Sequence, residues 1–336
     1  MELIINPTNK CNFDCTFCSA HNITKKEIDR ERLYKYLKCK ARDINIIIFN
    51  GGDPLLMDPA FYFGVLDITQ EFSIPISLTT NLLDFYKHPN KWVELFKTKN
   101  VGIITSYNHN STSRRLKNGK VYDKDMFIEV LNLFNDKIGY KPSFISVIEE
   151  DNSIEIMKDT VLFAKEIGTT CKLNKVLQYG NQKDYYPRYK FIAHYTKAMY
   201  DLTHQGIKVE RYETNFRNIH NFSNDKSSCC PLNRKCHNSI ICINTDFKFY
   251  PCSNMATNNK LYGKYNSNTA NNFTQDYQCI KSDCVLCDLF NFCNSCKSYV
   301  EECMRNNDTQ NYCLNMNSYY PYIKEFYTKY KIEEIN

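Results

Sequence analysis

Short apolar runs alternate with longer amphipathic stretches along the first two thirds of this 336-residue chain. The run "INIIIF" at 44–49 is almost wholly apolar, which is typical of a strand covered on both faces. Stretches whose apolar positions recur at helical spacing separate the runs. The pattern predicts strands at 2–6, 44–49, 75–80, 101–106, 143–149 and 171–178, and helices near 24–39, 59–72, 90–98, 122–136, 153–167 and 188–204.

This alternation of strands and helices predicts an α/β fold with a parallel sheet and right-handed crossovers. Six strand–helix units fit a partial (β/α)6 barrel and also an open, doubly wound sheet, and the periodicity does not distinguish the two. In both folds the chemistry gathers at the C-terminal ends of the strands. We expect Thr24 to cap the first helix, with Glu27 at the capping-box position.

The composition changes along the chain and predicts two domains. We expect residues 1–210 to form the α/β domain, the polar and turn-rich residues 211–228 to form a linker, and residues 229–336 to form a small cysteine-rich domain. The Asn-rich stretch 254–276 is typical of a long loop. The start, MELIINPTNK, does not have the pattern of a signal peptide, and no apolar stretch reaches the roughly 18 residues that a membrane span needs. We therefore expect a cytoplasmic protein with no membrane partner.

Cysteines are abundant and unevenly placed. The chain has 17 of them, of which three lie near the N-terminus and twelve lie at or after Cys229. In a reducing compartment such a count indicates metal or redox chemistry rather than disulfides. The net charge of +6 is mild, and no clustered basic stripe is present, so we expect no nucleic-acid partner.

Cys11, Cys15 and Cys18 follow the first predicted strand with the spacing C-x3-C-x2-C. A structural zinc site is closed by four protein ligands, and His21 is the one nearby candidate for a fourth. A four-iron cluster held by three thiolates keeps one iron open for another ligand, as catalytic metal sites do. The position of the loop at the chemical end of the sheet favours the cluster.

The cysteine spacing, with Phe17 just before the third cysteine, resembles the radical S-adenosylmethionine (SAM) superfamily. The turn Gly51-Gly52-Asp53 after the second predicted strand resembles the Gly-Gly-Glu-Pro turn that binds the methionine amino group in that family, with Asp in place of Glu. The resemblance implies a [4Fe–4S] cluster whose fourth iron binds SAM. It also implies reductive cleavage of SAM to a 5′-deoxyadenosyl radical that takes hydrogen from a substrate.

Three further positions resemble cofactor contacts of the family. Asn81 ends the third predicted strand, Ser106 ends the fourth, and Arg115 follows it. In the family such positions often touch the ribose or the carboxylate of SAM. Each is nearly as well explained by ordinary loop polarity.

The C-terminal cysteines resemble the SPASM domain, which carries auxiliary iron–sulfur clusters beside a radical SAM barrel. A predicted strand–turn–strand hairpin separates Cys236 from Cys252, and Cys229 and Cys303 compete as ligands with Cys230 and Cys313. A pair of zinc ribbons is the alternative. By resemblance, one auxiliary cluster uses Cys230, Cys236, Cys252 and Cys296, and the other uses Cys284, Cys287, Cys293 and Cys313. The spacing of Cys293 and Cys296 is one residue shorter than is usual in the family. Cys39, Cys171 and Cys242 are predicted to be small buried hydrophobes.

The resemblance implies a radical SAM oxidoreductase that modifies a peptide or protein, by crosslinking, epimerisation or oxidation during ribosomal peptide maturation. Ser253 stands where sulfatase-maturing relatives carry an Asp base, and a hydroxyl is a poor base at neutral pH, which disfavours sulfatase-type oxidation. Expected partners are a flavodoxin- or ferredoxin-type electron donor and, because the barrel begins at Glu2, a separate leader-binding partner. The alternatives are a small-metabolite substrate, and a non-catalytic zinc-binding structural or nucleic-acid-binding module.

Overall fold

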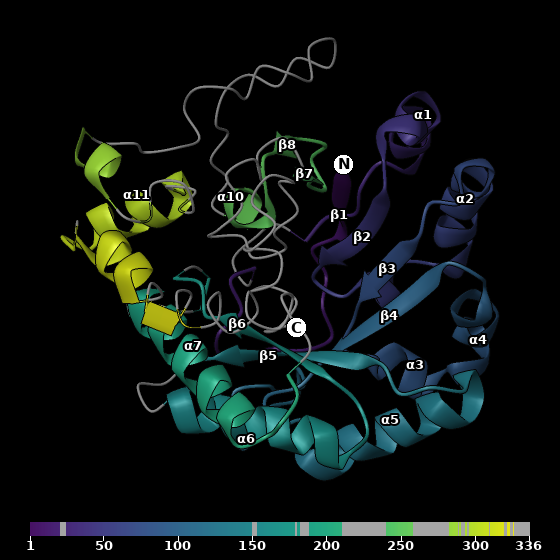
Figure 1. Cartoon of the computed structure of the whole chain (residues 1–336). Coiled ribbons are helices and arrows are strands. Elements are labelled where there is room, and N and C mark those ends of the chain that lie inside the picture. Colours follow the sequence, from purple (N-terminus) through teal and green to yellow (C-terminus); the bar gives the residue numbers. More distant parts are fainter. Residues whose placement is uncertain are drawn as a thin grey trace, which may run out of the picture. The chain divides into compact units, whose positions relative to one another are not determined.

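A computed structural model gives the architecture of the chain (Figure 1). It describes residues 1–20, 25–149, 153–178, 180–181, 188–209, 240–257, 282–287, 289, 293, 296–308, 310–318, 321–322 and 325. The chain divides into two compact units. The first comprises Met1–Ile148, Asp159–Asp184 and Ser239–Tyr265, and the second comprises Glu149–Lys158, Tyr185–Asn238 and Asn266–Asn336.

An eight-stranded sheet with the order β6-β5-β4-β3-β2-β1-β7-β8 organises the first unit. All neighbours pair in parallel except β7 and β8. Strands β1 to β6 lie side by side in the same order as in the sequence, so each crossover moves the chain one strand further in the same direction. In a doubly wound sheet the strand order reverses direction once. The sheet is therefore a partial barrel, and the prediction is confirmed. The strands are β1 Glu2–Thr8, β2 Ile46–Gly51, β3 Ile76–Thr79, β4 Val101–Ser106, β5 Ser143–Ile148, β6 Cys171–Lys175, β7 Ile240–Ile243 and β8 Phe249–Tyr250.

The helices of the described residues are α1 Arg30–Lys40, α2 Pro59–Thr69, α3 Leu83–Lys87, α4 Pro89–Lys97, α5 Lys124–Ile138, α6 Ser153–Glu166, α7 Arg188–His204, α10 Ser253–Thr257 and α11 Lys297–Arg305. Five of them, α2, α4, α5, α6 and α7, lie within three residues of their predicted ranges, whereas α3, α10 and α11 were not predicted. The start of α1 corrects the prediction, because the carboxylate of Asp29, and not Thr24, caps this helix by accepting from the Arg32 amide. No helix among the described residues is long and apolar enough to cross a membrane.

Alternate strand residues divide between two faces of the sheet. Leu3, Ile5 and Phe49 are fully buried, and the Phe49 ring lies 5.1 Å from the ring of Tyr62 on α2. The residues that alternate with them along β1, Ile4 and Asn6, are only partly buried. Because side chains alternate along a strand, one face carries the helix-covered core and the other is the inner face of the partial barrel.

The hairpin predicted between Cys236 and Cys252 is present as β7 and β8, which pair antiparallel. It extends the sheet of the first unit, because β7 pairs in parallel with β1. The side-chain amide of Asn6 donates to Asn244 Oδ1 at 2.6 Å, and Asn9 donates to Thr245 Oγ1 at 3.0 Å. The predicted boundaries of the two domains stay a prediction.

Three isolated cysteines test the prediction of buried thiols. Cys242 of β7 is fully buried, as predicted, and Cys171 is partly exposed. Cys39 is exposed, so that prediction was wrong. α1 buries Leu33 and Leu37, and Cys39 lies roughly 200° around the helix from Leu37, on its solvent side.

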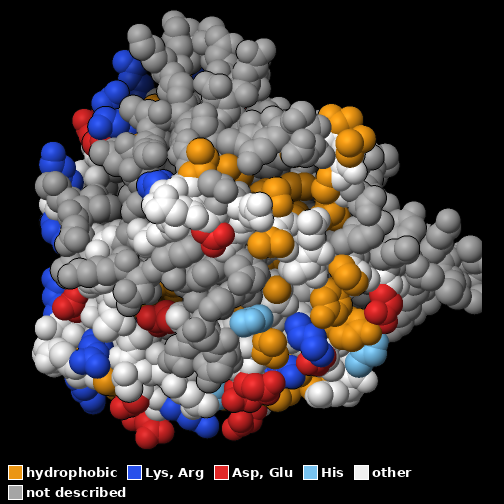
Figure 2. All heavy atoms as spheres, turned by 90° about the vertical axis from the view of Figure 1, so that its left-hand side faces the viewer, with side chains coloured by type: hydrophobic (Ala, Val, Ile, Leu, Met, Phe, Trp, Pro, Cys, Tyr) orange, Lys and Arg blue, Asp and Glu red, His pale blue; other side chains and the backbone are white. Residues whose placement is uncertain are grey.

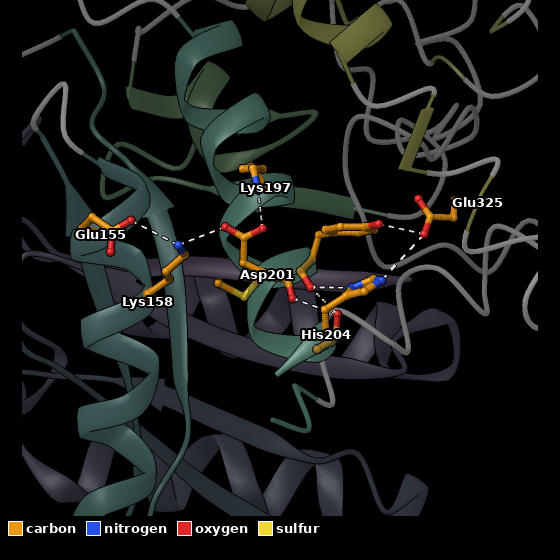
Figure 3. A network of polar contacts seen from close by, with 9 residues as sticks. Glu155, Lys158, Lys197, Asp201, His204 and Glu325 are labelled. Carbon is orange, nitrogen blue, oxygen red and sulfur yellow. Dashed lines mark hydrogen bonds and ion pairs between the residues drawn. The ribbon is translucent and has the colours of Figure 1, made fainter. Parts of the chain in front are cut away.

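Within the second unit, polar contacts join the start of α6, up to Lys158, to α7 (Figure 3). Lys158 lies 2.9 Å from Asp201, and Lys197 pairs with the same carboxylate. Farther along α7, the hydroxyl of Tyr200 donates to Glu325 at 2.7 Å. Because these groups are partly exposed, each pair contributes at most about 1 kcal/mol.

Several large apolar side chains of the second unit are exposed. They are Val285, Leu286, Met304 and Leu314, with exposed fractions of 65%, 90%, 57% and 53%. The face that carries α11 shows gathered hydrophobic atoms (Figure 2). The second unit therefore leaves part of its apolar surface open to solvent.

The turn between β7 and β8 contains a strained aromatic residue. Phe247 has a φ of 58°, in the left-handed region, and is 8% exposed. Its ring centroid lies 4.3 Å from the Arg32 guanidinium carbon and 6.2 Å from the Tyr36 ring of α1. A left-handed conformation costs an L-residue about 1–2 kcal/mol, so packing against α1 offsets the strain.

We expect Phe247→Ala and Phe247→Gly to lower the free energy of unfolding, by about 3–5 kcal/mol for the alanine variant. Glycine relieves the left-handed strain, so Phe247→Gly is expected to be about 1 kcal/mol more stable than Phe247→Ala. Urea titration monitored by fluorescence of Trp92, the chain's one tryptophan and fully buried, measures both. An alanine variant as stable as the glycine variant would contradict the strain at this position.

Candidate metal centre

The cysteine loop (residues 11–18) follows β1 and lies against the segment between β4 and α5. The amide of Asp14 donates to the Arg115 carbonyl at 2.7 Å, and the amide of Thr16 donates to the Ser113 carbonyl at 2.9 Å. Phe13 and Leu116 form an antiparallel bridge next to the Asp14–Arg115 contact. A short ladder therefore fixes the loop, although the loop has no regular secondary structure of its own.

The glycine turn after β2 holds the chain just before the cysteine loop. The amide of Gly52 donates to the Thr8 carbonyl at 2.9 Å, and the amide of Asp53 donates to the Lys10 carbonyl at 2.8 Å. A Cβ added to Gly52 would lie 2.0 Å from the Lys10 oxygen. Only glycine permits this close approach, so the predicted Gly51-Gly52 turn is required by packing alone.

Two more loops reach the cysteine loop from neighbouring strands. The side-chain amide of Asn81, after β3, donates to Asn12 Oδ1 at 2.6 Å and to Cys11 Sγ at 3.8 Å. After β6, the backbone amide of Asn181 donates to the Cys18 carbonyl at 3.0 Å, and its side chain donates to the Cys15 carbonyl at 3.1 Å. Loops that follow β2, β3, β4 and β6 therefore all fix the position of the cysteines.

Asp53 is 1% exposed and turned into the protein. Its carboxylate accepts from the Leu55 amide, the Thr80 hydroxyl and the Asn81 amide, each at 2.9 Å. Burial raises its pKa to about 6, although the three hydrogen bonds oppose the rise. Asp53 thus joins the turn after β2 to the loop after β3, and its predicted contact with a cofactor stays a prediction.

The thiols of the cysteine loop are protonated at neutral pH in the absence of a cation. Burial raises the pKa of Cys11 to about 12, and the Asp53 carboxylate adds to the rise. Burial also raises the pKa of Cys15 and Cys18, while the Arg114 guanidinium acts in the opposite direction. A bound metal stabilises the thiolate form, so three thiols of one loop fit a thiolate-binding group such as an iron–sulfur cluster.

No group of three or more His, Cys, Asp or Glu side chains among the described residues is arranged to hold a metal ion. The fit of the cysteine loop to a cluster therefore rests on the chemistry of its donors and on the backbone contacts around it.

Arg114 is a residue of this site that the sequence did not reveal. It is 7% exposed, and its guanidinium carbon lies 4.9 Å from the Phe17 ring centroid. Its Nε donates to Asn108 Oδ1 at 3.1 Å. The predicted contact, Arg115, instead donates to the Thr112 carbonyl at 3.1 Å. Neighbouring residues of the ladder point to opposite sides, so only its register distinguishes the two arginines.

The other predicted cofactor position, Ser106, lies at the end of β4 and is partly exposed. Asn50 of β2 and Thr79 of β3 are likewise partly exposed and belong to the inner face. Within the described part of the chain, none of these three side chains makes a hydrogen bond. They therefore leave polar groups open to a ligand at the C-terminal ends of three adjacent strands.

The predicted auxiliary ligands are described only in part. Cys229, Cys230 and Cys236 lie outside the described residues. Cys252 follows β8 in the first unit, and the remaining predicted ligands, Cys284, Cys287, Cys293, Cys296 and Cys313, belong to the second unit. Cys303 is 1% exposed, whereas Cys313 is exposed. The auxiliary clusters stay a prediction.

Comparison with known proteins identifies the fold. Residues 5–164 match the model of the radical SAM superfamily. Native anSMEcpe with bound AdoMet has a TM-score of 0.72 and 18% identity, over 98% of this chain and 99% of that chain. SuiB of Streptococcus suis, bound to the precursor peptide SuiA, has a TM-score of 0.62 and 19% identity, over 90% of this chain and 72% of that chain. None of the curated proteins matches the sequence.

These matches confirm the predicted resemblance to the radical SAM superfamily. The matched segment contains the cysteine loop, the glycine turn, Asn81, Ser106 and Arg114. A [4Fe–4S] cluster and SAM are the cofactors of this superfamily, so the predicted SAM-binding cluster and SAM are confirmed, whereas the auxiliary clusters stay a prediction. Identities this low show a shared fold, and they leave the substrate open.

Because a Cβ on Gly52 would collide with the Lys10 carbonyl, we expect Gly52→Ala to displace the start of the cysteine loop. The expected loss is about 1–3 kcal/mol in the free energy of unfolding, as for other overpacked sites. Alkylation of Cys11 and Cys18 is expected to become faster, as measured by peptide mass spectrometry. Gly102→Ala is the control, since its nearest atom would lie 3.9 Å away. Equal alkylation rates in the two variants would contradict the packing role of Gly52.

Proposed function

Because residues 5–164 form a radical SAM domain, we propose that this enzyme cleaves SAM reductively at the cysteine loop and takes hydrogen from a peptide or protein substrate. The observation that carries the proposal is the cysteine loop itself. It presents three thiols at the C-terminal ends of the barrel strands, where the loops that follow β2, β3, β4 and β6 fix it. Three thiolates leave the fourth iron of a cluster open to SAM.

Cys11, Cys15 and Cys18 would hold the cluster, and the turn at Gly51 and Gly52 would receive the methionine end of SAM. When bound, the cluster supplies the electron that breaks the sulfonium bond and so produces the radical that removes hydrogen. The partly exposed side chains of the inner face, together with Phe17 and Asn81, would orient SAM. Asp53 keeps the turn in place through its three hydrogen bonds.

Two groups beside the cysteine loop favour the thiolate form, in opposition to burial and to the Asp53 carboxylate. Arg114 brings a fixed positive charge next to Cys15 and Cys18, and the Asn81 amide donates to the Cys11 sulfur. Both groups are already held in place by other contacts, so orienting them requires no further free energy when the thiols lose their protons. A reduced flavodoxin or ferredoxin is the proposed electron donor.

Two relatives support a peptide or protein substrate over a small metabolite. SuiB is bound to the precursor peptide SuiA, and anSMEcpe, at 17% identity, is bound to AdoMet and the Cp18Cys peptide. In this chain Ser253 begins α10 directly after Cys252, and its hydroxyl lies beside the Cys242 thiol. Since a hydroxyl is a poor base, the reaction we propose is crosslinking or epimerisation rather than sulfatase-type oxidation.

We also propose that the cysteines from Cys230 onward hold two auxiliary clusters, as the resemblance to the SPASM domain implies. Cys313 is favoured over Cys303, because the neighbouring Tyr312 hydroxyl lies 3.4 Å from the sulfur of Cys293. Fully ligated clusters carry electrons or stabilise the fold, and they offer no open iron.

The test of the proposed function is SAM cleavage by the anaerobically reconstituted, dithionite-reduced chain. We expect 5′-deoxyadenosine from the wild type, and a loss of more than about 100-fold in Cys15→Ala, because a cluster ligand is removed. Cys171→Ala is the matched control, since this cysteine lies in β6, away from the cysteine loop. Cleavage that persists in Cys15→Ala, or is missing in the wild type, would refute the proposal.

A second experiment separates the two neighbouring arginines. We expect Arg114→Gln to slow SAM cleavage about 10- to 100-fold, as the loss of a group that orients and charges a metal ligand does. Arg115→Gln is expected to stay close to the wild type, because the Arg115 guanidinium donates to the Thr112 carbonyl, and the contact of Arg115 with the Cys15 thiol is made by its backbone, which the variant keeps. The measurement is the rate of 5′-deoxyadenosine formation at equal iron content. A greater loss in Arg115→Gln would restore the assignment made from the sequence.

A further inference from the structure

A groove of about 850 Å³ lies between α1 and α2 in the first unit. The two helices lie side by side (Figure 1). The groove is lined by residues of α1 and α2 and of the short 3₁₀ turns that follow them, η1 Ala41–Asp43 and η3 Gln70–Phe72. None of its lining residues belongs to the cysteine loop, so an inference from this groove is independent of the candidate metal centre.

The two walls of the groove carry opposite charges. Lys38 and Arg42 line it from the side of α1, and Asp67 and Glu71 line it from the side of α2. All four side chains are exposed. Within the described part of the chain, none of the four forms an ion pair. The groove therefore separates a row of cations from a row of carboxylates.

Tyr34 aligns the two helices. Its hydroxyl donates to the Phe61 carbonyl of α2 at 2.8 Å, and the two rings stack with their centroids 6.1 Å apart. A Cβ added to Gly64 would lie 2.4 Å from this hydroxyl, so the glycine leaves the space that the hydroxyl occupies. Both helices connect parallel strands and run in the same direction. The charged residues about one turn farther along each helix therefore lie at about the same level.

The groove also has an apolar part that is open to solvent. Phe72 is 37% exposed, Ile68 is partly buried, and Cys39 is exposed, and all three line the groove. Interfaces between proteins combine an apolar centre with a polar rim. Apolar side chains between two rows of charge have this composition.

We propose that the groove is the contact surface of a dimer, with a second copy of this chain as its occupant. A two-fold axis parallel to α1 and α2 places the basic wall of each copy opposite the acidic wall of the other, at the same level along the helices. Each pairing then occurs twice, as an isologous interface requires. Opposite charges on the two walls thus make the surface complementary to itself, whereas a surface with charges of one sign would repel its copy.

The interface is small. α1 and α2 each have 11 residues, so each is about 16 Å long. The paired faces of two such helices cover less area than a permanent dimer buries. We therefore expect a dissociation constant in the micromolar range, and an association that weakens as salt rises, because salt screens exposed charges.

Sedimentation equilibrium of the full chain, kept reduced so that Cys39 forms no disulfide, measures the association. Lys38→Glu/Arg42→Glu makes both walls acidic, and Asp67→Lys/Glu71→Lys makes both walls basic. We expect each variant to dimerise more than about 100-fold more weakly than the wild type, because like charges then face each other. All four side chains are exposed, so both variants are expected to fold, as circular dichroism verifies.

A mixture of the two variants tests the charge pairing itself. A chain with an acidic groove and a chain with a basic groove attract each other, so the mixture is expected to associate at least as tightly as the wild type. Lys97→Glu/Lys99→Glu is the matched control, because it changes the net charge as much as Lys38→Glu/Arg42→Glu does, on exposed residues outside the groove. We expect it to dimerise like the wild type.

A carbodiimide, which joins a lysine to a carboxylate in contact with it, gives a second measurement on the wild type. In a mixture of isotope-labelled and unlabelled protein, we expect peptides in which Lys38 of one copy is joined to Asp67 or Glu71 of the other. Such peptides combine labelled and unlabelled halves, which distinguishes a contact between copies from one within a chain.

A wild type that stays monomeric would overturn the proposal, and so would a peptide or another protein that is the one occupant of the groove. A dimer that the charge reversals leave unchanged, or a mixture of the reversed variants that does not associate, would also overturn it. Equal weakening in Lys97→Glu/Lys99→Glu would assign the effect to net charge rather than to the groove. None of these outcomes alters the test of SAM cleavage, which uses the cysteine loop.

Discussion

The backbone contact between Gly52 and Lys10 is the constraint on which the site depends. The cysteine loop has almost no regular structure of its own, so its shape is set by the chain packed around it. A side chain at Gly52 would occupy the space of the Lys10 carbonyl. The turn after β2 and the start of the loop can therefore meet only through glycine, and their two hydrogen bonds then align Thr8 and Lys10 ahead of Cys11.

The order of the strands makes this convergence possible. Since β1 to β6 follow one another around the sheet, the loops after β2, β3, β4 and β6 all lie at one end of the barrel. Each contributes a hydrogen bond or a charge to the cysteine loop, and Asp53 joins two of them from within the protein. The backbone of the cysteine loop is thus held largely by contacts between residues far apart in the sequence.

The features that were predicted correctly from the sequence are those set by hydrophobic periodicity and by local chemistry. Five of the six predicted strands agree with the structure to within two residues at either end, because buried parallel strands are short apolar runs between helices. The sequence did not predict contacts that depend on the register in which two segments pair. Arg114 and Arg115 are neighbours, and only the pairing of 113–117 with the cysteine loop places Arg114 beside Phe17. The exposure of Cys39 and the pairing of β7 with β1 likewise depend on contacts that no local pattern records.

The central claim is that the cysteine loop holds a four-iron cluster by three thiolates. The most direct test is the iron and sulfide content of the anaerobically reconstituted chain and of Cys11→Ala/Cys15→Ala/Cys18→Ala. With four irons in each cluster, the account predicts about twelve irons in the wild type and about eight in the triple variant. Equal iron content in the two proteins, or a colourless wild type that holds zinc, would contradict it.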